Sequence, residues 1–179
     1  GNIRSANEII EILNEATFDP ETVKIQIAEA KFMRAFMYLE MAKRYGGVPL
    51  ELTPKQLDAS YDELYTPRST LQATYEQIFA DLDAAIADLP GSAMSGKATK
   101  WAAHALKSRA ALYAARIAKY HPQSSDGLTS IPAGLAGGYY TMSHASASAI
   151  IDSGKYPLHT GGGTSVSYTH LTLPTKVRV

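Results

Sequence analysis

The longest regular pattern of apolar and polar positions in the chain runs through residues 28–50. Its apolar residues recur at steps of three or four, which places them on one face of an amphipathic helix. Gly46 and Gly47 follow the last turn, and glycine readily takes the positive φ that ends a helix. Pro49 cannot continue a helix and favours an extended backbone just before it. The pattern therefore predicts a long buried helix, beginning at Glu21, that stops sharply and leaves as an extended segment.

Two further patterns indicate where other helices begin. Residues 2–16 carry a shorter amphipathic pattern, and Asp19 is placed to cap the long helix that follows, with a proline at its first position. Ser69 starts a capping-box pattern, in which an N-cap hydroxyl is followed three positions later by the amide of Gln72. The apolar spacing after this box predicts a helix that ends at Pro90.

The second half of the chain contains two more helical patterns. Residues 98–120 are rich in alanine, which costs no side-chain entropy and lets helix axes approach closely. Four larger side chains are expected on the buried face of this helix: Leu106, Leu112, Tyr113 and Ile117. Residues 139–153 form a shorter pattern that Gly154 ends. Together the patterns predict an all-α domain.

Length and composition narrow the possible functions. The chain has 179 residues, enough for one domain, and its formal net charge is +0. The charge gives no electrostatic reason to expect nucleic acid or an anionic membrane as a partner. The sequence contains no cysteine, which excludes disulfides and thiolate metal sites, and no apolar run approaches the roughly 18 residues of a membrane span. Because a helical pattern begins at the first residues, without Met or a signal peptide, we expect the sequence to be a fragment.

The polar residues form no enzymatic or metal-binding motif. The five histidines include no pair at i, i+3 or i, i+4, so no metal site is predicted. Asp81 and Asp83 are two positions apart, on different faces of a helix, and are not a catalytic carboxylate pair. Glu29 and Arg34 are five positions apart and do not meet by simple helical geometry. We expect them to have partners on other helices and to fix helix docking, with ligand binding as the alternative.

The helical segments also carry a family resemblance. Residues 28–50 resemble the signature helix of the SusD/RagB family of outer-membrane nutrient-binding lipoproteins. The matching residues are Ala28, Glu29, Phe32, Arg34, Ala35, Tyr38, Tyr45, Gly46, Gly47, Val48 and Pro49. Later segments at 68–90, 96–113 and 150–158 match further family blocks in the same order. We expect the matched motif residues to be structural rather than ligand contacts.

The resemblance implies both a fold and a function. It implies that residues 1–160 form tetratricopeptide-like helical hairpins in an α–α superhelix with long irregular loops, as an incomplete SusD-like domain. It also implies an intact protein that is not an enzyme, needs no cofactor, captures oligosaccharides or polysaccharides and delivers them to a SusC-like TonB-dependent transporter. Such a protein faces outward on the outer membrane, held by a lipid anchor absent from this chain. A helical-repeat module that binds other proteins is the alternative.

Aromatic side chains are the candidate sugar contacts, because their flat faces stack on pyranose rings. Four tyrosines in predicted loops or at a helix start are therefore candidate ligand-binding residues: Tyr61, Tyr65, Tyr139 and Tyr140. Three other tyrosines lie on predicted core faces of helices and are expected to be buried: Tyr38, Tyr75 and Tyr113.

Residues 161–179 are predicted to be a separate segment, a Gly-rich linker followed by a tail without helical periodicity. The string SYTHLTLPT resembles a translated sequencing adapter. We therefore predict that residues 167–179 are adapter-derived and form a disordered tail that is not native to the protein. Partly alternating Thr, Val and Leu residues leave a β-strand as the alternative.

Overall fold

The computed structural model describes residues 1–56, 58, 60 and 64–157, and the structural statements here concern these residues. Within them the chain forms helices and no strand, which confirms the all-α prediction. The helices are α1 (Asn2–Asn14), α2 (Pro20–Tyr45), α4 (Leu71–Asp88), α5 (Lys100–Tyr120), the 3-10 turn η1 (Ala133–Leu135) and α6 (Ala136–Asp152). The predicted tail at 161–179 and the candidate Tyr61 lie outside the described residues.

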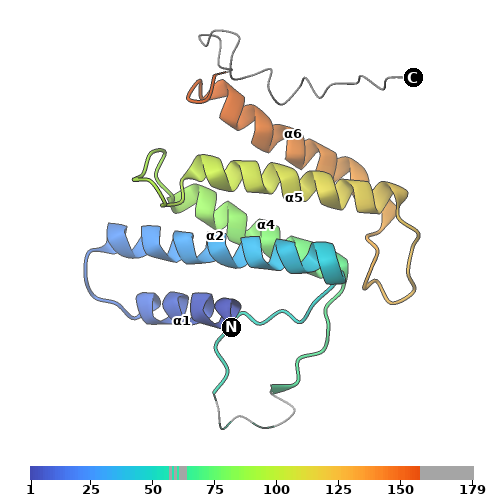
Figure 1. The fold of residues 1–179 in the computed structure, drawn as a ribbon, viewed down its shortest axis with the longest axis horizontal. Coiled ribbons are helices and arrows are strands. Elements are labelled where there is room, and N and C mark those ends of the chain that lie inside the picture. The colour runs from blue at the N-terminus through green and yellow to red at the C-terminus, as the bar shows by residue number, and fades with distance from the viewer. Residues whose placement is uncertain (57, 59, 61–63, 158–179) are drawn as a thin grey trace, which may run out of the picture.

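The helices stack in chain order, each packed against the one before it (Figure 1). The α1–α2 hairpin forms one end of the stack, α4 and α5 form a second hairpin, and α6 packs on α5 at the other end. A long connection between α2 and α4 projects on the side of α1 (Figure 1). None of these described helices has the length and apolarity needed to cross a membrane.

The helix starts follow the predicted capping chemistry with one correction. Asp19 caps α2 as predicted, since its carboxylate accepts a backbone N–H three residues later at 3.1 Å. At α4 the N-cap is Thr70 rather than Ser69, and the Thr70 hydroxyl accepts the Ala73 N–H at 3.1 Å. The Ser69 N–H donates instead to the Val48 carbonyl oxygen, which keeps Ser69 in the extended segment. A contact distant in sequence therefore moves the cap by one residue.

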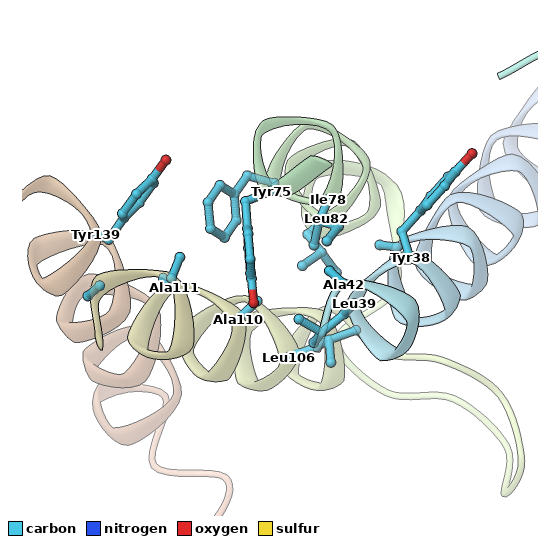
Figure 2. Packing of buried hydrophobic residues seen from close by; sticks show 14 of the residues in the cluster. Tyr38, Leu39, Ala42, Tyr75, Ile78, Leu82, Leu106, Ala110, Ala111 and Tyr139 are labelled. Atoms are coloured by element: carbon cyan, nitrogen blue, oxygen red, sulfur yellow. The ribbon is translucent and has the colours of Figure 1, made fainter. Parts of the chain in front are cut away.

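The core is built on the alanine face of α5. Its buried residues are Ala103, Leu106, Ala110, Ala111, Ala114, Ala115 and Ala118. Tyr75 of α4 extends onto Ala110, while Ile78 and Leu82 of α4 point toward α2 (Figure 2). Tyr38 and Tyr75 are both 0% exposed, as predicted. Helix α4 thus packs between α2 and α5.

Two large side chains of α5 do not point into this core. Leu112 is 53% exposed and Tyr113 is 38% exposed, so the predictions that they are buried are wrong. Alanines on both sides of them occupy the buried face. Helical periodicity alone does not distinguish an alanine stripe from the larger residues beside it, because both repeat every three or four positions.

Helix α6 begins three residues earlier than predicted, at Ala136. The η1 turn leads directly into it, and two glycines, Gly137 and Gly138, lie within its first turn. A glycine inside a helix costs up to about 1 kcal/mol relative to alanine, so local propensity does not favour a helix start at this position.

Candidate functional site

A groove of about 840 Å³ lies between the first turns of α1, the second half of α2 and the segment that follows α2. This volume lies within the roughly 300–1,000 Å³ common for ligand sites. Apolar residues form much of its lining: Ile3, Phe36, Met37, Met41, Val48, Pro49 and Pro54. Four charged residues lie among them: Arg4, Glu40, Glu51 and Lys55. An apolar groove with a few polar groups suits a small amphipathic ligand.

The backbone of Glu51, at the edge of this groove, is held by the buried Tyr38. The Tyr38 hydroxyl accepts the Glu51 N–H at 2.7 Å and donates to the Glu51 carbonyl oxygen at 2.9 Å. The Asn7 amide donates to the same carbonyl oxygen at 2.8 Å, so α1 and α2 both hold this residue. Burial raises the pKa of the Tyr38 hydroxyl above its ordinary value, which keeps the group protonated and able to donate.

Arg34 of α2 binds both the backbone of Leu52, the residue after Glu51, and side chains of two neighbouring helices. Its guanidinium forms a two-point ion pair with Asp81, in which Nε donates to Oδ2 at 2.8 Å and Nη2 to Oδ1 at 2.7 Å. Nη1 donates to Asn7 Oδ1 at 2.8 Å and, at 3.4 Å, to the Leu52 carbonyl oxygen. The partners of Arg34 thus come from α1 and α4, as its spacing to Glu29 led us to expect. Glu29 pairs at 2.9 Å with Lys97, which lies in the loop between α4 and α5, so the expectation of a partner on another helix is wrong for Glu29.

An ion pair between Glu51 and Lys55, together with a hydrogen bond to Thr66, holds the two ends of the α2–α4 connection together. Lys55 Nζ lies 2.8 Å from a Glu51 carboxylate oxygen and also donates to the Thr66 hydroxyl. Partial burial opposes ionisation of Glu51, but hydrogen bonds from Lys55 and Thr66 outweigh it and hold the pKa of this carboxyl below its usual value. Glu51 is therefore charged at neutral pH. Its ion pair joins residue 51 to residue 55, and the hydrogen bonds to Thr66 connect both side chains to the part of the connection that precedes α4.

The structure separates the candidate tyrosines rather than gathering them in one site. Tyr65 lies in the α2–α4 connection next to Thr66 and is 71% exposed. Tyr139 is only 7% exposed, with its ring centroid 5.6 Å from that of Phe79, so the expectation of an open stacking face there is wrong. Tyr140 packs partly buried against the core, with Lys119 Nζ 5.9 Å from its ring. Both α6 tyrosines lie at the opposite end of the stack from α1 (Figure 1).

The glycine pair of the motif forms a backbone junction as well as a helix stop. Gly46 has φ +77°, and a Cβ there would overlap the Leu128 carbonyl oxygen. The Gly47 N–H donates to that same carbonyl oxygen at 2.6 Å. Arg68 Nε donates to the Gly47 carbonyl oxygen at 2.8 Å. The end of α2, the start of α4 and the α5–η1 connection therefore meet at two residues that lack side chains.

The other motif residues divide between core and surface. Ala35 is fully buried, Phe32 packs at the edge of the core, and Pro49 lines the groove. Tyr45 is 65% exposed at the end of α2. In the described part of the chain, no three His, Asp or Glu side chains gather where they could hold a metal ion.

Sequence reasoning missed several residues that shape this region. Asn7 lies on the predicted apolar face of α1, and a polar residue on such a face was the available signal of a buried hydrogen bond. Glu51 and Lys55 lie in a segment without periodicity and gave no such signal. The separation of the two aspartates is confirmed, because Asp81 is 3% exposed whereas the Asp83 side chain is 56% exposed.

Comparisons with known proteins agree with this geometry. A family model described as "Starch-binding associating with outer membrane" (SusD-like) matches residues 1–112. A SusD-like protein from Bacteroides fragilis NCTC 9343 is 36% identical with a TM-score of 0.59, over 64% of this chain and 22% of that one. A SusD superfamily protein from Parabacteroides distasonis ATCC 8503 is 26% identical with a TM-score of 0.68, over 87% of this chain and 30% of that one. A laminarin-binding SusD-like protein is 27% identical with a TM-score of 0.58, over 64% of this chain and 25% of that one.

These similarities confirm the tetratricopeptide-like stack of helical hairpins expected from the resemblance. The chain spans between 22% and 30% of the length of the three solved proteins. No curated protein matches the chain.

Proposed function

Because the chain belongs to the SusD-like family, described as starch-binding and associated with the outer membrane, we propose that the intact protein is a cell-surface glycan-binding protein. It captures oligosaccharides and delivers them to a SusC-like TonB-dependent transporter, without making or breaking bonds. It faces outward and is held by a lipid anchor outside this sequence. The observation that carries the proposal is the family match over residues 1–112, and the laminarin-binding relative supports a glycan as the ligand.

Within the described residues, the α2–α4 connection and the adjoining groove are the best-suited place for sugar contacts. Tyr65 is 71% exposed there, and aromatic rings stack on the apolar faces of sugars. Arg4, Glu40, Glu51 and Lys55 supply charged groups along the groove. Such groups form strong hydrogen bonds with sugar hydroxyls, because one partner is ionised.

Replacing Tyr65 with alanine in the full-length protein is expected to weaken glycan binding about tenfold, the loss of one stacking contact. The measurement is affinity electrophoresis against a panel of polysaccharides that includes laminarin. Tyr120→Ala is the matched control, since Tyr120 is 68% exposed at the end of α5, away from the groove. Retention of no polysaccharide by the wild type would overturn glycan binding. Equal retention of wild type and Tyr65→Ala would overturn only this location of the site.

Delivery to a transporter predicts a physical complex in the outer membrane. We expect the tagged full-length protein to co-purify in stoichiometric amount with the TonB-dependent transporter encoded nearest to its gene. Deleting the gene for the binding protein should slow uptake of the bound glycan. A wild-type rate of uptake in the deletion strain, with no transporter in the purified sample, would reject delivery while leaving glycan binding intact.

A further inference from the structure

We propose that Tyr38 and Arg34 are positioning residues for ligand binding, which hold the backbone of Glu51 and Leu52 and thereby the segment 51–56 beside the groove. The inference rests on the proposed function, since it takes this segment as part of the glycan site. Neither side chain is a candidate ligand contact, because Tyr38 is 0% exposed and Arg34 is 6% exposed. Both act through the segment that they hold.

The contact between Tyr38 and Glu51 sets an orientation as well as a position. One hydroxyl accepts the N–H and donates to the C=O of the same residue, at 2.7 and 2.9 Å. A single hydrogen bond would leave Glu51 free to rotate about it. Two hydrogen bonds, which join its N–H and its C=O to the same hydroxyl, prevent that rotation. The Asn7 amide occupies the second acceptor position of the Glu51 carbonyl oxygen, so no further donor is needed there.

Arg34 makes the position of Leu52 depend on helix packing. The guanidinium is planar, and its N–H groups point in fixed directions. Asp81 of α4 and Asn7 of α1 set its plane, and Gln77 in turn donates to Asp81 Oδ1 at 3.1 Å. The remaining contact, from Nη1 to the Leu52 carbonyl oxygen, therefore has its direction fixed by two neighbouring helices.

The acceptors of these hydrogen bonds indicate that the side chains position the segment 51–56, and do not only satisfy buried polar groups. Three side chains, from Asn7 of α1 and from Arg34 and Tyr38 of α2, donate hydrogen bonds to the backbone of residues 51 and 52. These two residues lie outside any helix. The segment then continues to Lys55, which forms an ion pair with Glu51. Lys55 also donates a hydrogen bond to Thr66, in the part of the connection that precedes α4. The anchor at residues 51 and 52 thus orients side chains along the groove.

The test is Tyr38→Phe in the full-length protein, compared with Tyr75→Phe. Both tyrosines are 0% exposed, but the Tyr75 hydroxyl has no hydrogen-bond partner within the described residues. Tyr38→Phe removes only the hydroxyl. We expect the amide hydrogen of Glu51, which donates to that hydroxyl, to exchange about tenfold faster, as for loss of a buried hydrogen bond. Exchange in α5 should stay unchanged, and the dissociation constant for laminarin should rise several-fold.

Each outcome decides a separate claim. Faster exchange at Glu51, together with weaker laminarin binding, supports the proposal, provided that Tyr75→Phe changes neither. Unchanged exchange in Tyr38→Phe, or faster exchange with unaltered laminarin affinity, overturns it. If the wild type does not bind laminarin, that failure belongs to the proposed ligand, and the exchange measurement still decides whether Tyr38 holds the segment.

Discussion

Replacing Asp81 with leucine is expected to lower the free energy of unfolding by about 3–5 kcal/mol, because it leaves a buried charge without its partner. The side chains of Arg34 and Asp81 are 7% and 4% exposed, and they share a two-point ion pair. Arginine does not lose its proton in proteins, so the guanidinium stays charged after the substitution. Denaturant unfolding of the full-length protein, followed by circular dichroism, measures the effect.

Asp83→Leu is the matched control for this prediction. Asp83 lies on the same helix, and its side chain is 56% exposed in an ion pair with Lys107. The Asp83 carboxylate is more than half exposed, although the Lys107 side chain is only 14% exposed, so we expect this variant to lose less stability than Asp81→Leu. The double variant Arg34→Met with Asp81→Leu should recover part of the loss, because it removes both charges. Equal destabilisation by Asp81→Leu and Asp83→Leu would show that the buried ion pair does not hold α2 against α4.

Local patterns predicted the helices well because a helix is specified by its own periodicity and its own ends. Asp19 caps α2 as predicted, since the N–H that it accepts is three residues away. The same reasoning failed at Ser69, whose N–H donates to Val48, more than twenty residues earlier in the chain. It also failed at Leu112 and Tyr113, because whether a helix face is buried depends on the helices that pack against it.

The candidate site was less predictable than the fold for the same reason. The exposure of Tyr65 agrees with its place in a non-periodic segment. The groove, however, is formed by α1, α2 and the segment after α2, and its volume follows from how these pack. The spacing of Glu29 and Arg34 excluded a pair between them but did not identify Asp81 or Asn7 as partners. Long-range contacts of this kind have no period in the sequence.

Replacing Gly47 with alanine is expected to destabilise the protein by about 3 kcal/mol, the upper end of the usual effect of overpacking. A Cβ at this position would overlap the Ser69 carbonyl oxygen and lie 2.8 Å from the backbone nitrogen of Leu71. Both neighbours are backbone atoms, which cannot rotate away as a flexible side chain can. The start of α4 would have to move, and with it the helix that carries Asp81. Thermal unfolding of the full-length protein measures the loss.

Gly137→Ala in α6 is the control with the opposite expected sign. A Cβ at Gly137 has nothing within 4 Å. Gly137 lies in the first turn of α6, so we expect alanine to be more favourable than glycine by at most the roughly 0.5–1 kcal/mol found in a helix interior. The same methyl group is added in both variants. If Gly137→Ala stabilises the protein and Gly47→Ala destabilises it, then glycine is needed at position 47 because other backbone atoms approach it closely. If Gly47→Ala unfolds at the wild-type temperature, the junction tolerates a Cβ, and the glycine is needed for another reason.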